Sequence, residues 1–331
     1  MNSVESFVDI NEVNVSSRFN VFVKNASLWL SMFPLGWFFR KFPITFSYRV
    51  AGLISRLAYL IAGKRRRILK EEAGKLFGSI FSEAEIESII KRTFAIYLKR
   101  QVENIAFDRM TQKHLDRIIS VEGWNNFSNV ERKKKGVIIL LAHFGSFLLP
   151  LPFLAYRGYR VYQIAGKPLI DDQGFVMRKI FEARKKQTDK MPFRFLLTDK
   201  YLGPVVRALK RGGVVVIAFD GRTGTEMIPM RLLNRTAQFS PGPFKLAYKS
   251  GATLLPTFVV RGSDNKHRMV FEPPIQFDMR NHDEDALMSS MNRFLRIFEN
   301  YLLKYPCHFA MTLFTLKKEA SEGLNPSLFI D

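Results

Sequence analysis

Cysteine is nearly absent from this chain of 331 residues, since Cys307 is the only one. A lone thiol excludes an intramolecular disulfide and a cysteine-rich zinc site, and it fits a reducing compartment. Acidic residues are also scarce: 30 Asp and Glu stand against 51 Lys and Arg, giving a formal net charge of +21 and a pI near 10.1. Such a charge predicts an anionic partner: nucleic acid, an anionic membrane surface or an acidic carrier protein.

Several familiar motifs are missing from the chain. It has no Gly-x-Ser-x-Gly elbow, no Gly-x4-Gly-Lys-Ser/Thr phosphate loop and no metal-ligand cluster, so we predict neither a metal nor a cofactor. No zinc finger or aromatic single-strand platform is recognisable, so nucleic acid is the least favoured partner. The 31 phenylalanines beside the many cations favour a lipid interface, where aromatic and basic side chains are stable together.

The N-terminal part has apolar runs, but none reaches the roughly 20 apolar residues of a membrane-spanning helix. Residues 1–24 are polar and predict a loose tail, with no visible signal peptide. The run 26–39 includes Trp29 and Trp37, is broken by a proline and a glycine, and indicates an interfacial anchor rather than a tilted span. Residues 48–63 have apolar positions at helical spacing and predict an amphipathic helix.

A run of four cations, Lys64–Arg67, follows that amphipathic stretch directly. Most such runs lie on a solvated helix face. Next to two amphipathic stretches, the alternative is that Arg65, Arg66 and Arg67 bind the phosphate headgroups of a membrane. Both interpretations stay open at this point. Residues 25–120 as a whole are expected to form a helical, membrane-associated region.

From residue 121 onward, short β-branched runs alternate with longer amphipathic ones. This alternation predicts an α/β fold, with a central mixed, mostly parallel sheet flanked by helices. The sheet and its helices are expected to span residues 121–318, followed by a C-terminal tail at 319–331. Strands are expected in the ranges 136–143, 159–165, 214–220, 253–260 and 267–272. Helices are expected from Ser82, which opens a capping box with Glu85, across 102–119, from near Ser146, and at 175–186, 200–211, 243–249 and 283–305.

Two of the expected buried strands end at polar residues, His143 and Asp220. The carboxyl ends of parallel strands share one edge of a sheet, and neighbouring strands lie about 4.8 Å apart. The two side chains therefore converge if their strands are neighbours. An acid beside a histidine fixes the ring tautomer and supports the imidazolium that forms when the ring accepts a proton. The alternatives are a histidine merely satisfied at a strand end and an aspartate that caps a turn.

Candidate substrate-binding residues are expected around His143 and Asp220. Lys167, Arg222 and Arg235 are candidate anion binders, although an arginine judged singly is more often a surface charge. Ser240 and Gly242 precede an expected helix, whose N-terminal amides could hold a phosphate or an oxyanion.

The chain resembles the bacterial lipid A biosynthesis acyltransferases, the late lauroyl and myristoyl transferases, which are relatives of glycerolipid acyltransferases with a His-x4-acid motif. The resemblance covers roughly residues 25–315. It lies in the order of these segments: Lys64–Arg67, His143-Phe-Gly, Gly166-Lys-Pro-Leu-Ile170, Ala218-Phe-Asp-Gly-Arg222, Phe239-Ser-Pro-Gly242 and the hairpin from Pro256 to Pro274.

The resemblance implies transfer of an acyl chain from an acyl carrier protein or CoA thioester to a hydroxyl of a membrane glycolipid or phospholipid. It implies that His143 is the general base and that Lys167 and Asp220 match the family's basic and acidic positions. It also implies a place on the cytoplasmic face of a bacterial inner membrane, peripheral or with a single N-terminal anchor. An acidic carrier and a phosphorylated acceptor would account for the charge.

One departure from the family pattern concerns the motif acid, which lies five residues after the histidine. Here that position is Leu148, and neither neighbour is acidic. Either Asp220 supplies the acid, or the base works without one, or the protein has lost catalysis. The last case would make it a catalytically silent homologue that binds lipid or a carrier protein.

Overall fold

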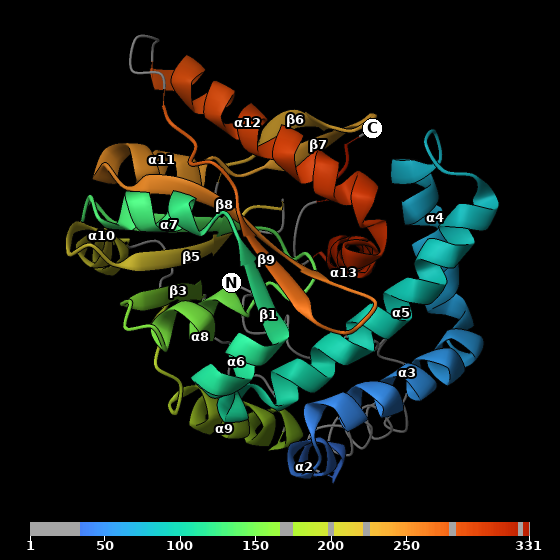
Figure 1. Cartoon of the computed structure of the whole chain (residues 1–331). Coiled ribbons are helices and arrows are strands. Elements are labelled where there is room, and N and C mark those ends of the chain that lie inside the picture. The colour runs from blue at the N-terminus through green and yellow to red at the C-terminus, as the bar shows by residue number, and fades with distance from the viewer. Residues whose placement is uncertain are drawn as a thin grey trace.

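The computed structural model describes residues 34–165, 175–197, 202–220, 226–277, 283–323 and 327–330. It consists of a seven-stranded sheet with helices on both faces, and the helices α2 to α5 lie together along one side (Figure 1). The expected α/β class with a mostly parallel sheet is confirmed.

The sheet has the strand order β1-β9-β8-β2-β5-β3-β4. The strands β8, β2, β5, β3 and β4 are parallel to one another, while β9 is antiparallel to β8 and parallel to β1. In chain order the strands are β1 (Ile119–Glu122), β2 (Val137–Leu141), β3 (Val161–Ala165), β4 (Arg194–Leu197), β5 (Val214–Ala218), β8 (Thr253–Arg261) and β9 (His267–Phe271). A separate hairpin pairs β6 (Ile228–Leu232) with β7 (Arg235–Phe239).

The helices before and between the strands account for most of the remaining described residues. They are α2 (Pro34–Lys41), α3 (Ile44–Ile61), α4 (Gly63–Phe77), α5 (Glu83–Ile105), α6 (Gln112–Ile118), α7 (Trp124–Glu131), α8 (Pro150–Ala155), α9 (Phe175–Thr188), α10 (Gly203–Lys210), α11 (Gly242–Ser250), α12 (Asp283–Lys304) and α13 (Ala310–Ser321). Short 3₁₀ turns occur at Phe107–Arg109 and Pro306–His308. None of these described helices is both long and apolar enough to cross a membrane.

The central strand β2 divides the core into two clusters of buried side chains, because successive side chains of a strand point to opposite faces. Ile138 and Leu140 belong to the cluster covered by α4, α5, α12 and α13. Val137, Ile139 and Leu141 belong to the cluster covered by α6, α7 and α8. All five residues of β2 are buried, as expected of a strand with helices on both faces.

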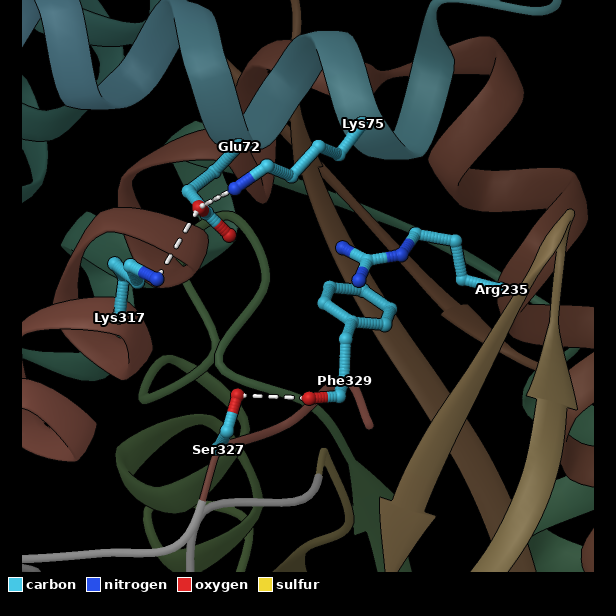
Figure 2. A pocket seen from close by; sticks show the side chains of 6 residues that line it. All are labelled: Glu72, Lys75, Arg235, Lys317, Ser327 and Phe329. Carbon is cyan, nitrogen blue, oxygen red and sulfur yellow. Dashed lines mark hydrogen bonds and ion pairs between the residues drawn. The ribbon is translucent and has the colours of Figure 1, made fainter. Parts of the chain in front are cut away.

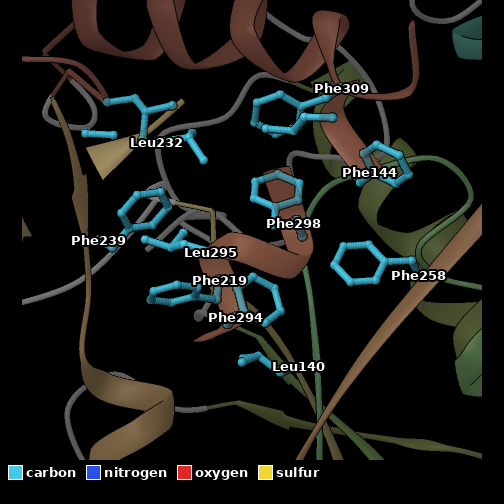
Figure 3. Close-up of a cluster of buried hydrophobic side chains, with 14 of the residues drawn as sticks. Leu140, Phe144, Phe219, Leu232, Phe239, Phe258, Phe294, Leu295, Phe298 and Phe309 are labelled. Atoms are coloured by element: carbon cyan, nitrogen blue, oxygen red, sulfur yellow. The ribbon is translucent and has the colours of Figure 1, made fainter. Parts of the chain in front are cut away.

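The first cluster is rich in aromatic rings (Figure 3). Phe219, which precedes Asp220, packs 5.0 Å from Phe239 of β7 and 5.3 Å from Phe294 of α12, between ring centroids. The same cluster contains residues of α4 and α5. The N-terminal helices therefore share one hydrophobic core with the sheet.

Two sequence-based helix predictions are wrong in their bounds. No helix starts near Ser146, since α8 begins at Pro150. The reason is that Gly145 has a φ of +57° and the amides of His143, Gly145 and Ser146 donate to distant segments instead of forming a helical turn. The expected continuous helix at 102–119 is interrupted after Ile105 and begins again at Gln112, where the Thr111 side chain caps α6. The capping box predicted at Ser82 and Glu85 is confirmed.

Candidate active site

His143 and Asp220 meet because of the register between β2 and β5. The two strands pair directly in parallel, with Leu141 opposite Ala218. Each polar residue lies two positions beyond its strand, at the same level of the sheet edge, and the Phe219 amide donates to the Leu141 carbonyl (2.7 Å) to continue the pairing. This is the edge at which open α/β sheets place their ligands.

A single carboxylate oxygen holds His143 in place. Asp220 Oδ2 accepts a hydrogen bond from the His143 backbone amide at 2.7 Å and lies 2.6 Å from the ring Nδ1. When Nδ1 carries the proton of the neutral ring, it donates to this oxygen and leaves Nε2 as the proton acceptor. The Asp220 side chain is 2% exposed and that of His143 is 16% exposed, so the acid is enclosed while the ring remains accessible.

The loop after β2 is tied down on its other side by the C-terminal helices. The Thr312 hydroxyl of α13 donates to the His143 carbonyl at 2.5 Å. The Gly145 amide donates to the His308 carbonyl at 3.1 Å. A Cβ atom on Gly145 would lie 2.1 Å from the Val259 carbonyl oxygen, so only glycine fits where the loop crosses β8.

A buried cluster around Glu103 of α5 supports the same loop. One Glu103 oxygen accepts from the Ser146 hydroxyl at 2.7 Å. The other accepts from the Tyr48 hydroxyl at 2.7 Å and pairs with the Arg261 guanidinium, and His267 Nε2 lies 2.9 Å from it. Burial alone would raise the pKa of the Glu103 carboxyl, but the charges of Arg261 and His267 with these hydrogen bonds hold it well below its usual range. The cluster therefore remains charged and fixes the backbone next to His143.

His308 is part of this support as a neutral ring. Its Nε2 accepts the Arg261 backbone amide at 3.0 Å, and its ring stacks on Phe144 with 5.3 Å between centroids. Burial, followed by the positive charges of Arg261, His267, Arg100 and Arg92, lowers the pKa of His308 to about 3. His308 is thus a structural hydrogen-bond acceptor at neutral pH.

Leu148 occupies the position of the motif acid without contributing any charge. It is buried in the second core cluster with Phe147 and Leu149. The Phe147 ring contacts the His143 ring edge-on, with 4.7 Å between centroids. The carboxylate next to the histidine is therefore that of Asp220, which comes from β5 instead of from the segment after the histidine.

The family model for bacterial lipid A biosynthesis acyltransferases matches residues 17–313. The chain belongs to this family. The resemblance inferred from the sequence is thereby confirmed.

No curated protein matches the chain. One solved structure with a similarity is that of the 1-acyl-sn-glycerophosphate (LPA) acyltransferase PlsC from Thermotoga maritima. It is 13% identical, has a TM-score of 0.35, and the similarity covers 72% of this chain and 98% of that chain. The assignment to the lipid A acyltransferase family rests on the family model.

The structure describes three of the five candidate substrate-binding residues of this lipid A acyltransferase family member. Lys167 and Arg222 are outside the described residues. Ser240 precedes α11, where its hydroxyl accepts the Gly242 amide at 3.3 Å. Arg235 lies at the start of β7 and faces α4 and α13 across a pocket (Figure 2).

The candidate headgroup-binding residues that the structure describes lie on two helices, α2 and α4. Trp29 is outside the described residues, and Trp37 is exposed on α2. The predicted basic run forms the first turn of α4. There Arg65 lies over the Phe314 ring and Arg66 over the Tyr59 ring, each 5.0 Å from the ring centroid, while Arg67 is exposed.

The sequence reasoning missed Glu103 and Thr312 as supports of the histidine loop. The one local sign was an acid that directly follows the apolar Val102 on a helix, and an acid on a helix is more often exposed. Among the described residues, no group of three or more His, Cys, Asp and Glu side chains is arranged to hold a metal.

Proposed function

We propose that the protein is a membrane-associated acyltransferase. It moves a fatty acyl chain from an acyl carrier protein or CoA thioester to a hydroxyl of a glycolipid or phospholipid, with His143 as the general base. The observation that carries the proposal is the 2.6 Å contact between His143 Nδ1 and Asp220 Oδ2, in a member of a family of acyltransferases.

The geometry supports a base that acts in both halves of the reaction. His143 Nε2 accepts the proton of the acceptor hydroxyl as its oxygen attacks the thioester carbonyl. Asp220 stabilises the resulting imidazolium, whose proton then passes to the departing thiolate. An ester and a free thiol are formed, and the histidine returns to its neutral state.

The oxyanion of the tetrahedral intermediate requires donors beyond the histidine loop. The backbone amides of four successive residues already donate within the protein: His143 to Asp220, and those of Phe144, Gly145 and Ser146 to backbone carbonyls. Lys167, which matches the family's basic position, and Arg222, a candidate anion binder, remain our candidates for this role.

A membrane site for the reaction is supported by α3, whose burial pattern is inverted relative to that of a soluble helix. Its buried residues are Ser47, Tyr48, Ala51 and Ser55, which face α5. Its large aliphatic side chains are exposed instead, including Leu60 at 66% and Ile61 at 76%. Exposed apolar groups of this extent suit the boundary between headgroups and acyl chains.

The charges around this face match an anionic bilayer. Residues 34–70 contain nine Lys and Arg and no Asp or Glu. Arg49, Arg56 and Lys64 are exposed beside the apolar side chains of α3. We therefore propose that α2, α3 and the start of α4 lie on the cytoplasmic face of the bacterial inner membrane, with the basic side chains at the lipid phosphates.

Intact-lipid mass spectrometry on four strains tests the function: native, gene-deleted, and deleted strains complemented with His143→Ala or with His114→Ala. His114 is exposed on α6 and serves as the matched control. We expect one lipid to lose the mass of an acyl chain on deletion, to stay short with His143→Ala and to recover with His114→Ala. Full recovery with His143→Ala would refute the role of this histidine, and an unchanged profile on deletion would favour the catalytically silent binding protein.

A further inference from the structure

A second candidate ligand site lies away from His143, in a pocket of about 410 Å³ between α4, β7, α13 and the C-terminal segment (Figure 2). Three of its six lining residues are cations and one is an acid. The lining consists of Glu72, Lys75, Arg235, Lys317, Ser327 and Phe329. Pockets of this volume hold small ligands.

The wall formed by Arg235 and Phe329 is held in place by backbone pairing. Residues 328–330 run beside β7, where the Gln238 amide donates to the Leu328 carbonyl at 2.8 Å and the Ile330 amide to the Thr236 carbonyl at 3.2 Å. The Phe329 ring is thereby buried against the hairpin, and the Arg235 guanidinium lies 4.0 Å from its centroid. This stacking fixes the plane of the guanidinium before any ligand arrives.

The opposite wall carries two lysines that share one buried carboxylate. Lys75 Nζ lies 3.0 Å from Glu72 Oε1, and Lys317 Nζ lies 3.9 Å from the same oxygen. Glu72 is 8% exposed, whereas the lysine side chains are 40% and 47% exposed. The acid therefore sets the positions of the two ammonium groups while leaving them accessible to a ligand.

Described residues next to the pocket add one acid, Glu71, and one cation, Arg67. Glu71 pairs with Lys75 from outside the lining, at 2.5 Å. The hydrogen bond from Lys75, with the charges of Lys317 and Arg67, lowers the pKa of Glu71. Among the described side chains at this pocket, Lys75, Arg235, Lys317 and Arg67 are cations, and Glu71 and Glu72 are acids.

We propose that this pocket binds a phosphate monoester. A planar arginine fork suits two oxygens of a phosphate, and two lysine ammonium groups suit its second negative charge. The same chemistry is found in a phosphorylated lipid headgroup and in a soluble phosphate ester. Lys317 is five residues beyond Thr312, which contacts His143, so the pocket lies about 7.5 Å further along α13.

Titration calorimetry of the full chain with glucose 1-phosphate tests the site. We expect binding to weaken about tenfold or more in Arg235→Ala and in Lys317→Ala, because each removes a charge-assisted hydrogen bond. Lys249→Ala removes an equal charge from the exposed surface of α11 and is expected to bind like the native protein. Lys317 is half exposed on its helix, so its replacement leaves the fold intact.

Vesicles distinguish the two sources of the phosphate. Phosphatidylcholine vesicles are mixed either with phosphatidic acid, a monoester, or with phosphatidylglycerol, a diester, at equal surface charge. If the ligand is a lipid headgroup, we expect the native protein to bind phosphatidic acid vesicles more tightly than phosphatidylglycerol vesicles. This preference should be lost in Lys317→Ala and kept in Lys249→Ala. If the ligand is a soluble ester, we expect the protein to bind glucose 1-phosphate and to bind both kinds of vesicle equally.

The proposal is overturned if the native protein shows neither glucose 1-phosphate binding nor the phosphatidic acid preference, or if the pocket variants and Lys249→Ala behave alike. His143→Ala is expected to retain ligand binding at the pocket. A result that refutes phosphate binding at the pocket therefore does not refute the proposed acyl transfer. In the same way, a result that refutes acyl transfer does not refute phosphate binding.

Discussion

At the scale of single residues, one oxygen of Asp220 serves two purposes. It accepts the backbone amide of His143, which places the loop, and it contacts the ring Nδ1, which sets the tautomer. A carboxylate four or five residues after the histidine would have to be brought to the ring by a helical turn. Here Gly145 and Ser146 leave the helical path, and the acid comes from the neighbouring strand.

Replacing Asp220 with Asn keeps an oxygen for the backbone amide but removes the charge that supports the imidazolium. We expect Asp220→Asn to lower kcat by about 10⁴, as in triads that lose their acid, with a much smaller change in KM. Steady-state transfer assays measure both constants, and circular dichroism confirms the fold. A kcat within tenfold of the native value would show that the base works without this acid.

At the scale of secondary-structure elements, α3 carries the proposed membrane contact. Its inner face, which carries Tyr48 and smaller residues, lies against α5, where the Tyr48 hydroxyl donates to Glu103. Its outer face carries exposed leucines that a helix in water would turn inward. The same helix thus connects the proposed membrane contact to the buried cluster that supports the His143 loop.

The double variant Leu57→Glu/Leu60→Glu tests the membrane contact. Both side chains are exposed, so we expect the stability of the fold to change little and binding to anionic vesicles to weaken at least tenfold. Co-sedimentation with phosphatidylglycerol vesicles measures this. Leu303→Glu on α12 replaces another exposed leucine and is expected to bind like the native protein; equal loss in both variants would argue against α3 as the contact.

At the scale of the whole molecule, the N-terminal helices and the sheet are joined through one core and one polar network. Leu69 and Phe94 lie in the same cluster as Leu140 of β2. Arg261 of β8 pairs with Glu103 of α5 and donates its amide to His308. Loss of this network is expected to lower the stability of the N-terminal helices and of the sheet together.

Acid unfolding reports on that network through His308. Its pKa of about 3 lies below the ordinary value near 6.5, so the unfolded chain binds a proton before the folded one. His308 therefore contributes stability that is complete above pH 6.5 and is lost as the pH falls towards 3. The expected slope is about 1.4 kcal/mol per pH unit.

Urea unfolding of the native protein and of His308→Gln across pH 3 to 7 measures this contribution. The glutamine retains an acceptor for the Arg261 amide but does not titrate, so we expect a flatter dependence on pH. The exposed His114→Gln serves as the control and is expected to follow the native curve. If His308→Gln also follows the native curve, His308 is not the group responsible.

The sequence by itself determined most strands, the helix cap at Ser82 and the net charge of the surface. Buried strands followed by His143 and Asp220, the capping box at Ser82, and the acid-free segment 34–70 are all visible in the order of residues. They are visible because the alternation of side chains in strands, the caps of helices and the net charge depend on neighbours in the chain.

Only the tertiary structure decided which of these pieces meet. The pairing of β2 with β5 places Asp220 at His143 across 77 residues, and Thr312 reaches the same loop across 169. Helices α5 and α13 pack against the sheet, and this packing brings Glu103 to that loop. It also brings Lys75, Arg235 and Lys317 to one pocket. Such contacts depend on the common core, whose arrangement follows from many weak packing interactions and has no local pattern along the chain.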